Sequence, residues 1–200
     1  VWMSTKPGAT VATAFRDTVR AHPDRVALRS FDGDTATELT YAEYGERACR
    51  LAASLAAHGV ARGDRVVLMM GNRPEFHIAD VAVLLCGATP ISIYSSSAPD
   101  QIAYLVSHSK ARFAIVEHEH YLTEMLSVRG ELPTLEQITV IEPPAELPEG
   151  VLRWDDQFSL DPVDLDAAAV VEDDAGFCQT QPLSVGLAAR GDQHDIGVER

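Results

Sequence analysis

An unbroken apolar run at residues 65–70 constrains the fold of this chain more than any other feature. The run reads Arg-Val-Val-Leu-Met-Met, so apolar side chains would point to both faces of a strand. Strands of this kind are typical of a parallel sheet that is covered on both sides. Further strand patterns at 89–94, 112–116 and 138–141 alternate with helical patterns. This alternation indicates right-handed βαβ units, and we predict the α/β class with a parallel sheet.

Start and stop signals place helices around these strands. Thr40 and Glu43 form the Thr-x-x-Glu pattern of a capping box, and Gly59 marks the C-terminal end of that helix. An apolar stripe at helical spacing follows the capping box and consists of Tyr44, Ala48, Leu51, Ala52, Leu55 and Ala56. Other helices are predicted at 11–21, at 75–86, after Ser97 as an N-cap, and at 121–128.

A turn sequence near the N-terminus predicts a hairpin. Asp-Gly-Asp at 32–34 separates a strand pattern at 26–31 from another at 35–40, which is rich in β-branched residues. An Asp-Gly dipeptide between two strands favours the tight turn of a β-hairpin.

The net charge of −14 is concentrated in one stretch of the chain. Residues 131–174 hold 13 acidic side chains and one basic side chain, Arg153, whereas residues 1–130 carry a net charge of −1. Such a chain offers neither the basic face of a nucleic-acid binder nor the polybasic patch that binds anionic lipid. Because like-charge blocks are usually solvated, we expect residues 131–174 to be poorly packed.

Cysteine usage and hydropathy point to a cytoplasmic chain. The three cysteines, Cys49, Cys86 and Cys178, form neither a disulfide framework nor a zinc-like pair, and we expect Cys49 and Cys86 to be core residues. The N-terminus lacks the apolar core of a secretory signal. The longest uncharged window, 81–99, is interrupted by polar residues and proline, so we expect a buried helix and a buried strand there rather than a membrane span.

Neither common phosphate-binding loop occurs in the sequence. Gly-x-Gly-x-x-Gly and Gly-x-x-x-x-Gly-Lys-Ser/Thr are both missing, and neither Lys6 nor Lys110 follows a glycine cluster. The three serines at 95–97 could be imagined as a loop that grips phosphate. A strand-to-helix turn that ends in an N-cap is the favoured interpretation.

Other groups of reactive side chains give no catalytic or metal site. In Glu-His-Glu-His at 117–120 only two histidines could converge, so the exposed start of a helix is favoured over a metal site. Carboxylate pairs at 155–156 and 173–174 fit a solvated face better than a cation site. The remaining candidates have no visible partner in the sequence: His22, His58, His77, His108, His194, Ser30, Ser54 and Ser107.

Three stretches, taken in order, resemble one enzyme family. They are Leu-Thr-Tyr-Ala-Glu-Tyr at 39–44 with Gly-Asp-Arg-Val at 63–66, Gly-Asn-Arg-Pro-Glu-Phe at 71–76, and Gly-Ala-Thr-Pro-Ile-Ser-Ile-Tyr at 87–94 with its continuation through 101–111. Over about residues 11–174 the chain resembles the N-terminal part of the AMP-forming acyl-CoA synthetases. The spacing of Ser-Ile-Tyr and Gln-Ile-Ala-Tyr is most similar to the long-chain fatty-acid–CoA ligases.

The resemblance implies a parent activity in two steps. A fatty acid attacks ATP to give an acyl-adenylate and pyrophosphate, with magnesium screening the phosphates, and CoA then takes the acyl group as a thioester. The resemblance also implies that this stretch builds one sheet-and-helix subdomain of the large N-terminal domain of such a ligase.

The sequence departs from the family pattern after residue 174. Family members continue into a Ser/Thr/Gly-rich loop that ends in Pro-Lys and holds the ATP phosphates, whereas residues 175–183 read Ala-Gly-Phe-Cys-Gln-Thr-Gln-Pro-Leu. No catalytic, cofactor-binding or metal-binding residue can therefore be carried over. We expect a truncated or frame-disrupted ligase with an α/β subdomain at 10–142, an acidic connector at 143–174 and a tail without family resemblance at 175–200.

Three functions stay open at this point. The first is a fragment of a fatty-acid–CoA ligase that is inactive as an isolated chain and needs no cofactor itself, although the complete enzyme uses ATP, magnesium and CoA. The second is a non-catalytic subunit that pairs with a separately encoded ligase remainder. The third is a module that binds acyl chains or CoA, and only the apolar character of residues 81–93 supports it.

Overall fold

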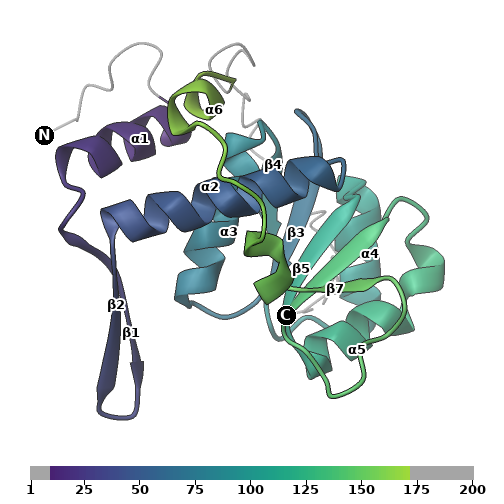
Figure 1. Cartoon of the computed structure of the whole chain (residues 1–200). Helices are drawn as coiled ribbons and strands as arrows, with labels where there is room; N and C mark the ends of the chain where they lie inside the picture. The colour runs from purple at the N-terminus through teal and green to yellow at the C-terminus, as the bar shows by residue number, and fades with distance from the viewer. Residues whose placement is uncertain (1–9, 172–200) are drawn as a thin grey trace, which may run out of the picture.

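A computed structural model describes residues 10–171 of the chain (Figure 1). The helices are α1 (Val11–Ala21), α2 (Tyr41–Ala57), α3 (Pro74–Leu85), α4 (Pro99–Ser109), α5 (Glu119–Ser127) and α6 (Leu165–Val171), with short 3₁₀ turns η1 (Arg129–Glu131) and η2 (Asp155–Phe158). The strands are β1 (Val26–Asp32), β2 (Thr35–Thr40), β3 (Arg65–Met69), β4 (Thr89–Ser92), β5 (Phe113–His118), β6 (Gln137–Glu142) and β7 (Val151–Arg153).

Five strands form one parallel sheet in the order β4-β3-β5-β6-β7. The predicted apolar strand β3 lies inside this sheet, where Val67 pairs with Ile91 of β4 and with Ala114 of β5. The sheet therefore confirms the α/β class, and the order corresponds to the 2-1-3-4-5 arrangement of doubly wound folds. The strand at 138–141 was the last one that the sequence patterns predicted. They did not predict β7, a three-residue strand in which Arg153 pairs with Val140 of β6.

Helices cover both faces of the sheet. Val66 and Leu68 of β3 belong to the cluster that also holds α2 and α3, whereas Val67 and Met69 belong to the cluster formed with α4 and α5. All four side chains have no exposed surface. Burial on both faces explains why this strand carries no polar position after Arg65.

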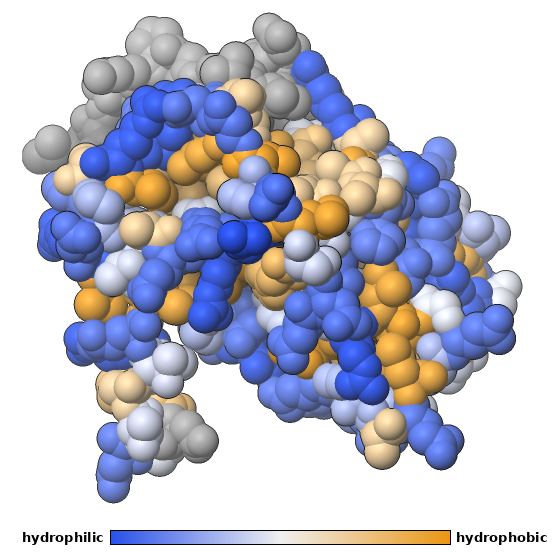
Figure 2. Space-filling model, in the orientation of Figure 1, coloured by the Kyte–Doolittle hydropathy of each residue, from blue (hydrophilic) through white to orange (hydrophobic). Residues whose placement is uncertain are grey.

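The capping box predicted for α2 is present. The hydroxyl of Thr40 accepts a hydrogen bond from the backbone nitrogen of Glu43 at 3.2 Å, and the carboxylate of Glu43 accepts one from the backbone nitrogen of Thr40 at 2.8 Å. The buried side of α2 packs on α1 through an edge-to-face contact between Phe15 and Tyr44, whose ring centroids are 4.8 Å apart. Figure 2 shows hydrophilic groups on the outer side of α1 and hydrophobic side chains along its boundary with α2.

The predicted hairpin of β1 and β2 forms a second sheet of its own. Its strands pair only with each other, from Val26 opposite Thr40 to Asp32 opposite Thr35. Gly33 lies at the turn with a φ of 56°, a backbone conformation that glycine adopts without strain. The hairpin extends away from the helices and the main sheet (Figure 1).

The expectation that residues 131–174 are poorly packed is wrong for much of this stretch. Strand β7 joins the main sheet, and Trp154 and Gln157 are buried against the body of the protein. Helix α6 lies beside α1 (Figure 1), where Asp166 forms ion pairs with Arg16 and Arg20. Apolar residues placed between the acidic ones explain the difference: Ile138, Val151 and Trp154 are buried, while Asp155 and Asp156 are exposed.

Candidate functional site

The strand order makes the carboxyl ends of β3 and β5 a candidate binding site. Strand β3 continues into α3 on one face of the sheet, and its neighbour β5 continues into α5 on the other face. Connections that leave adjacent strands in opposite directions create a topological switch point, which is where open α/β sheets bind their ligands.

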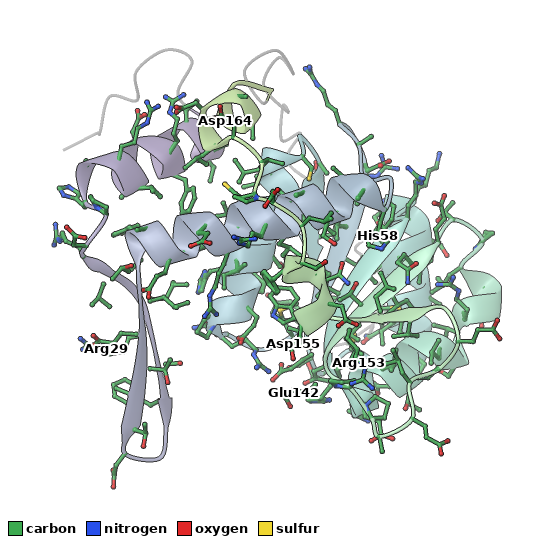
Figure 3. All side chains as sticks on the ribbon, viewed as in Figure 1. Arg29, His58, Glu142, Arg153, Asp155 and Asp164 are labelled. Atoms are coloured by element: carbon green, nitrogen blue, oxygen red, sulfur yellow. The ribbon has the colours of Figure 1, made fainter. Side chains whose placement is uncertain are left out.

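A cluster of ion pairs around Arg73 occupies this switch point. The guanidinium of Arg73 donates hydrogen bonds to Glu75 at 2.8 Å, to Glu117 at 3.1 Å and to Glu142 at 2.7 Å. The second oxygen of Glu117 accepts a hydrogen bond from the backbone nitrogen of Gly71 at 2.6 Å. These contacts, which we call the Arg73 cluster, join the exits of β3, β5 and β6; Figure 3 labels Glu142 at this end of the sheet.

The charge balance of the Arg73 cluster decides what it can bind. One guanidinium faces three carboxylates, a formal net charge of −2. Burial alone would lower the pKa of Arg73, but its hydrogen bonds to Glu75 and Glu142 raise that pKa overall, so the guanidinium stays charged. Because its Nε and Nη1 atoms donate to carboxylates and the cluster carries a net negative charge, the cluster is suited to holding three chain segments together and not to gripping phosphate.

Sequence reasoning did not find the Arg73 cluster. Glu117 and Glu142 are 44 and 69 positions away from Arg73, so no local pattern connects them. A usable signal was present nonetheless, because each of the three residues lies at or just after the carboxyl end of a predicted strand.

An open hollow lies one strand further, between the exits of β3 and β4. Its volume is about 520 Å³, within the range of ligand pockets. Apolar and uncharged polar groups line it, including Met70, Asn72, Phe76, Ile93, Tyr94 and Ser95. We call it the Tyr94 hollow, because the ring of Tyr94 stands at its rim with 85% of its surface exposed. No acidic or basic side chain is among its lining residues.

The serines at 95–97 lie in the predicted turn between β4 and α4, but the prediction of Ser97 as the N-cap is wrong. Ser97 is buried and is not the N-cap of α4; that position belongs to Ala98, whose backbone nitrogen donates to the side chain of Gln101 at 3.0 Å. The glutamine side chain thus supplies the cap that was expected from serine. Ser95 lines the Tyr94 hollow as an uncharged polar group.

The Glu-His-Glu-His segment at 117–120 is divided between two elements. Glu117 and His118 still belong to β5, and α5 begins at Glu119. The ring of His118 stacks on Tyr121 with centroids 4.1 Å apart, and His120 lies near Glu124 at 3.5 Å. Within residues 10–171, no group of three or more histidine, cysteine, aspartate or glutamate side chains is arranged to hold a metal ion.

Ser54 and His58, which looked isolated in sequence, lie one helical turn apart and in contact. The Ser54 hydroxyl donates to Gln157 at 2.7 Å, while the Nδ1 atom of His58 lies 2.8 Å from the carbonyl oxygen of Ser54. The imidazole therefore faces the backbone, and the hydroxyl is engaged by an amide, so the pair is not arranged as nucleophile and base. Figure 3 shows His58 at the C-terminal end of α2.

The other candidate side chains are spread over the molecule. His77 lies 3.3 Å from Asn72, and His108 stacks on Tyr104. Asp155 and Asp156 are exposed, as expected for a solvated face. Lys6, Cys178, His194 and the carboxylates at 173–174 lie outside the described residues.

Cys49 is buried in the core, as predicted, whereas Cys86 is half-buried and packs against the core. Burial raises the pKa of Cys49 to about 11 and that of Cys86 to about 12. Both thiols are therefore protonated near neutral pH, and the Cys86 thiol contacts the carbonyl oxygen of Ala52 at 3.5 Å. Neither is a reactive thiolate.

The uncharged window at 81–99 forms the end of α3, strand β4 and the start of α4. In the described part of the chain, no helix has both the length and the hydropathy required to cross a bilayer.

Comparisons with known proteins give a consistent picture. The family model described as AMP-binding enzyme matches residues 15–180. An uncharacterized protein of Mycobacterium tuberculosis is 35% identical over 144 residues, which cover 71% of this chain and 79% of that protein. A long-chain-fatty-acid–CoA ligase of Xenopus laevis is 32% identical over 133 residues, which cover 66% of this chain and 18% of the ligase.

A solved structure shares the fold. The crystal structure of an anthranilate CoA ligase in complex with anthranoyl-AMP matches with a TM-score of 0.68 and 26% identity, over 77% of this chain and 28% of that one. The chain therefore spans less than a third of the length of these two ligases.

Proposed function

Because this chain belongs to the AMP-binding enzyme family, we propose that it serves as one part of a fatty-acid–CoA ligase. The observation that carries the proposal is the family match over residues 15–180, together with relatives named as long-chain-fatty-acid–CoA ligases. The resemblance of the three motif stretches to AMP-forming acyl-CoA synthetases agrees with this match.

The complete ligase would activate a fatty acid with ATP and magnesium and transfer the acyl group to CoA. In our proposal this chain supplies a sheet-and-helix subdomain, and none of its residues takes part in the chemical steps. The Arg73 cluster supports this assignment, because the guanidinium at the switch point is already held by three carboxylates. A phosphate approaching this edge would meet net negative charge.

We propose the same three parts for the chain as the sequence suggests, namely 10–142, 143–174 and 175–200. The packing of β7 and α6 indicates that the acidic part folds together with the first part. The family match ends at residue 180 and so includes six residues of the last part. A cytoplasmic location fits the charge, the cysteine usage and the family.

A second candidate is a non-catalytic subunit whose partner is a separately encoded ligase remainder. The hairpin of β1 and β2 favours it, because its strands pair only with each other and therefore leave their outer edges unpaired. This candidate agrees with the first in its main consequence, that activity requires a second polypeptide.

Fatty-acid-dependent exchange between ATP and pyrophosphate tests the proposal. The purified chain is assayed alone and then together with the polypeptide encoded by the adjacent reading frame, which would supply the rest of the ligase. We expect no exchange by the chain alone and exchange by the mixture. Exchange by the chain alone would contradict the assignment of chemistry to other residues, and exchange by the mixture with aryl acids only would contradict the fatty-acid substrate.

A further inference from the structure

Two exposed tyrosine rings border a groove to which the proposed function assigns no role. Tyr94 follows β4 and Tyr104 lies on α4, with 85% and 64% of their surfaces exposed. Both line an open groove of about 570 Å³ along the start of α4, together with Asp100, Gln101 and Leu105. We call it the Tyr104 groove. Large exposed aromatic side chains that meet in one concave surface are typical of binding sites.

The ring of Tyr104 is held in place by a neighbour on the same helix. It stacks on the imidazole of His108, with centroids 5.4 Å apart and an angle of 15° between the two planes. Residues four positions apart lie one above the other on a helix, so the contact needs no rearrangement. The ring stays largely exposed despite this contact. The face of an aromatic ring carries partial negative charge and therefore attracts cations.

The charges around the Tyr104 groove also favour a cation. Asp100 is exposed, is the only charged side chain among the lining residues, and forms no ion pair within residues 10–171. The amino end of α4 opposes it with about half an elementary charge, which leaves a negative excess. Tyr94 also lines the neighbouring hollow, where Gly71 donates to Glu117 of the negatively charged Arg73 cluster. A cation is therefore attracted to this face and an anion is repelled.

We propose that the Tyr104 groove binds a small, water-soluble quaternary ammonium compound such as choline. The methyl groups of such a cation contact the faces of Tyr94 and Tyr104, and the carboxylate of Asp100 balances its charge. The side-chain oxygen of Gln101 already accepts the backbone hydrogen of Ala98, at 3.0 Å, so its amide nitrogen remains to donate to a ligand hydroxyl. The proposal is independent of the ligase function.

Tyrosine ring signals provide a direct test. The chain has five tyrosines, of which Tyr94 and Tyr104 line the groove, whereas Tyr44 is buried and Tyr121 stacks on His118. The full chain with ¹³C-labelled tyrosine is titrated with choline chloride, which replaces sodium chloride so that the ionic strength stays constant. The uncharged carbon analogue of choline, in which a tert-butyl group replaces the trimethylammonium group, is titrated in parallel.

We expect saturable shifts of the Tyr94 and Tyr104 signals with choline and weaker binding of the carbon analogue. Tyr94→Leu and Tyr104→Leu assign the signals, and each should weaken choline about two- to five-fold through loss of one exposed contact between ring and cation. Tyr104→Phe keeps the ring and should leave binding unchanged. Asp100→Asn should weaken choline but not the analogue. Asp34→Asn, which removes the same charge from an exposed side chain at the hairpin turn, should change neither.

The proposal is overturned if choline and its carbon analogue bind equally, if neither ring signal shows a saturable shift, or if Asp100→Asn and Asp34→Asn have equal effects. Shifts that follow the protein concentration in place of choline would assign the groove to self-association and would also overturn it. The titration uses neither ATP nor a second polypeptide. Its failure is therefore distinguishable from failure of the proposed function, which the exchange assay tests.

Discussion

The carboxylate of Glu117 accepts a hydrogen bond from the backbone nitrogen of Gly71 at 2.6 Å, across 46 positions of sequence. This contact joins the end of β5 to the turn after β3 and places a negative charge at the switch point of the sheet. It gives this edge two different halves: one is closed by ion pairs around Arg73, and the other is an uncharged hollow beside Tyr94.

Replacement of Glu117 by glutamine should destabilise the protein. The variant loses a charge-assisted contact with Arg73 and weakens the bond from Gly71, and hydrogen bonds to charged groups contribute about 2 kcal/mol. We expect the free energy of unfolding in urea to fall by about that amount. Glu119→Gln, which removes the same charge from an exposed side chain two residues later, should cost less than about 1 kcal/mol. Equal losses in the two variants would contradict the role of the Arg73 cluster.

Removal of the cap of α2 should lower stability and weaken its dependence on pH. Thr40→Ala removes both the acceptor for Glu43 nitrogen and the side-chain donor to Glu43, and loss of an N-cap typically costs about 1 kcal/mol. Hydrogen bonds from Thr40 lower the pKa of Glu43 in the folded protein below its ordinary value of 4.5. A lowered pKa stabilises the fold above pH 4.5, and this contribution disappears as the pH falls through the folded-state pKa.

The difference in unfolding free energy between the parent chain and Thr40→Ala should therefore shrink as the pH falls below 4.5. Urea unfolding over that range measures it, and the ¹³C shift of the Glu43 carboxyl group follows the titration directly. An ordinary midpoint for Glu43 in the parent chain would contradict the capping box.

Gln157→Ala should show that the acidic stretch is part of the folded body. The amide of Gln157 accepts the hydrogen bond of the buried Ser54 hydroxyl on α2, and its loss leaves that hydroxyl without an acceptor. An unsatisfied buried polar group costs about 1–3 kcal/mol, so unfolding should be easier by that amount. Asp156→Ala, an exposed neighbour, should change stability by less than about 0.5 kcal/mol. Equal stability of the two variants would contradict this expectation and would favour a solvated connector at residues 131–174.

The thiols of Cys49 and Cys86 should react slowly until the chain unfolds. With Cys178 replaced by serine, only Cys49 and Cys86 remain, and burial raises their pKa values to about 11 and about 12. At about pH 8, near the ordinary pKa of a thiol, both should react slowly with a disulfide reagent in buffer and rapidly in urea. Fast reaction of the folded variant would show that one of the two thiols is accessible.

Local patterns in the sequence predicted the main elements well. The apolar run at 65–70 identified β3 because a strand buried on both faces tolerates no polar alternation. Thr40, Glu43 and Gly59 identified α2 because the signals for its two ends are local. The hairpin turn at Gly33 was equally readable, since its geometry depends on adjacent residues.

What the sequence did not predict depends on contacts between distant residues. Strand β7 has three residues and exists because β6 offers a free edge, and Trp154 is buried because α2 and β6 lie beside it in space. Ser97 looked like an N-cap, yet Gln101 supplies the cap from inside the helix. The Arg73 cluster depends on the order of the strands in the sheet, and the spacing of residues along the sequence does not reveal that order.

The most direct test of the account is ATP–pyrophosphate exchange that depends on an added long-chain fatty acid, measured with and without the polypeptide that supplies the rest of the ligase. A mixture in which the fatty acid is left out provides the blank. Our account predicts exchange only when both polypeptides and the fatty acid are present. Fatty-acid-dependent exchange by this chain alone would contradict it.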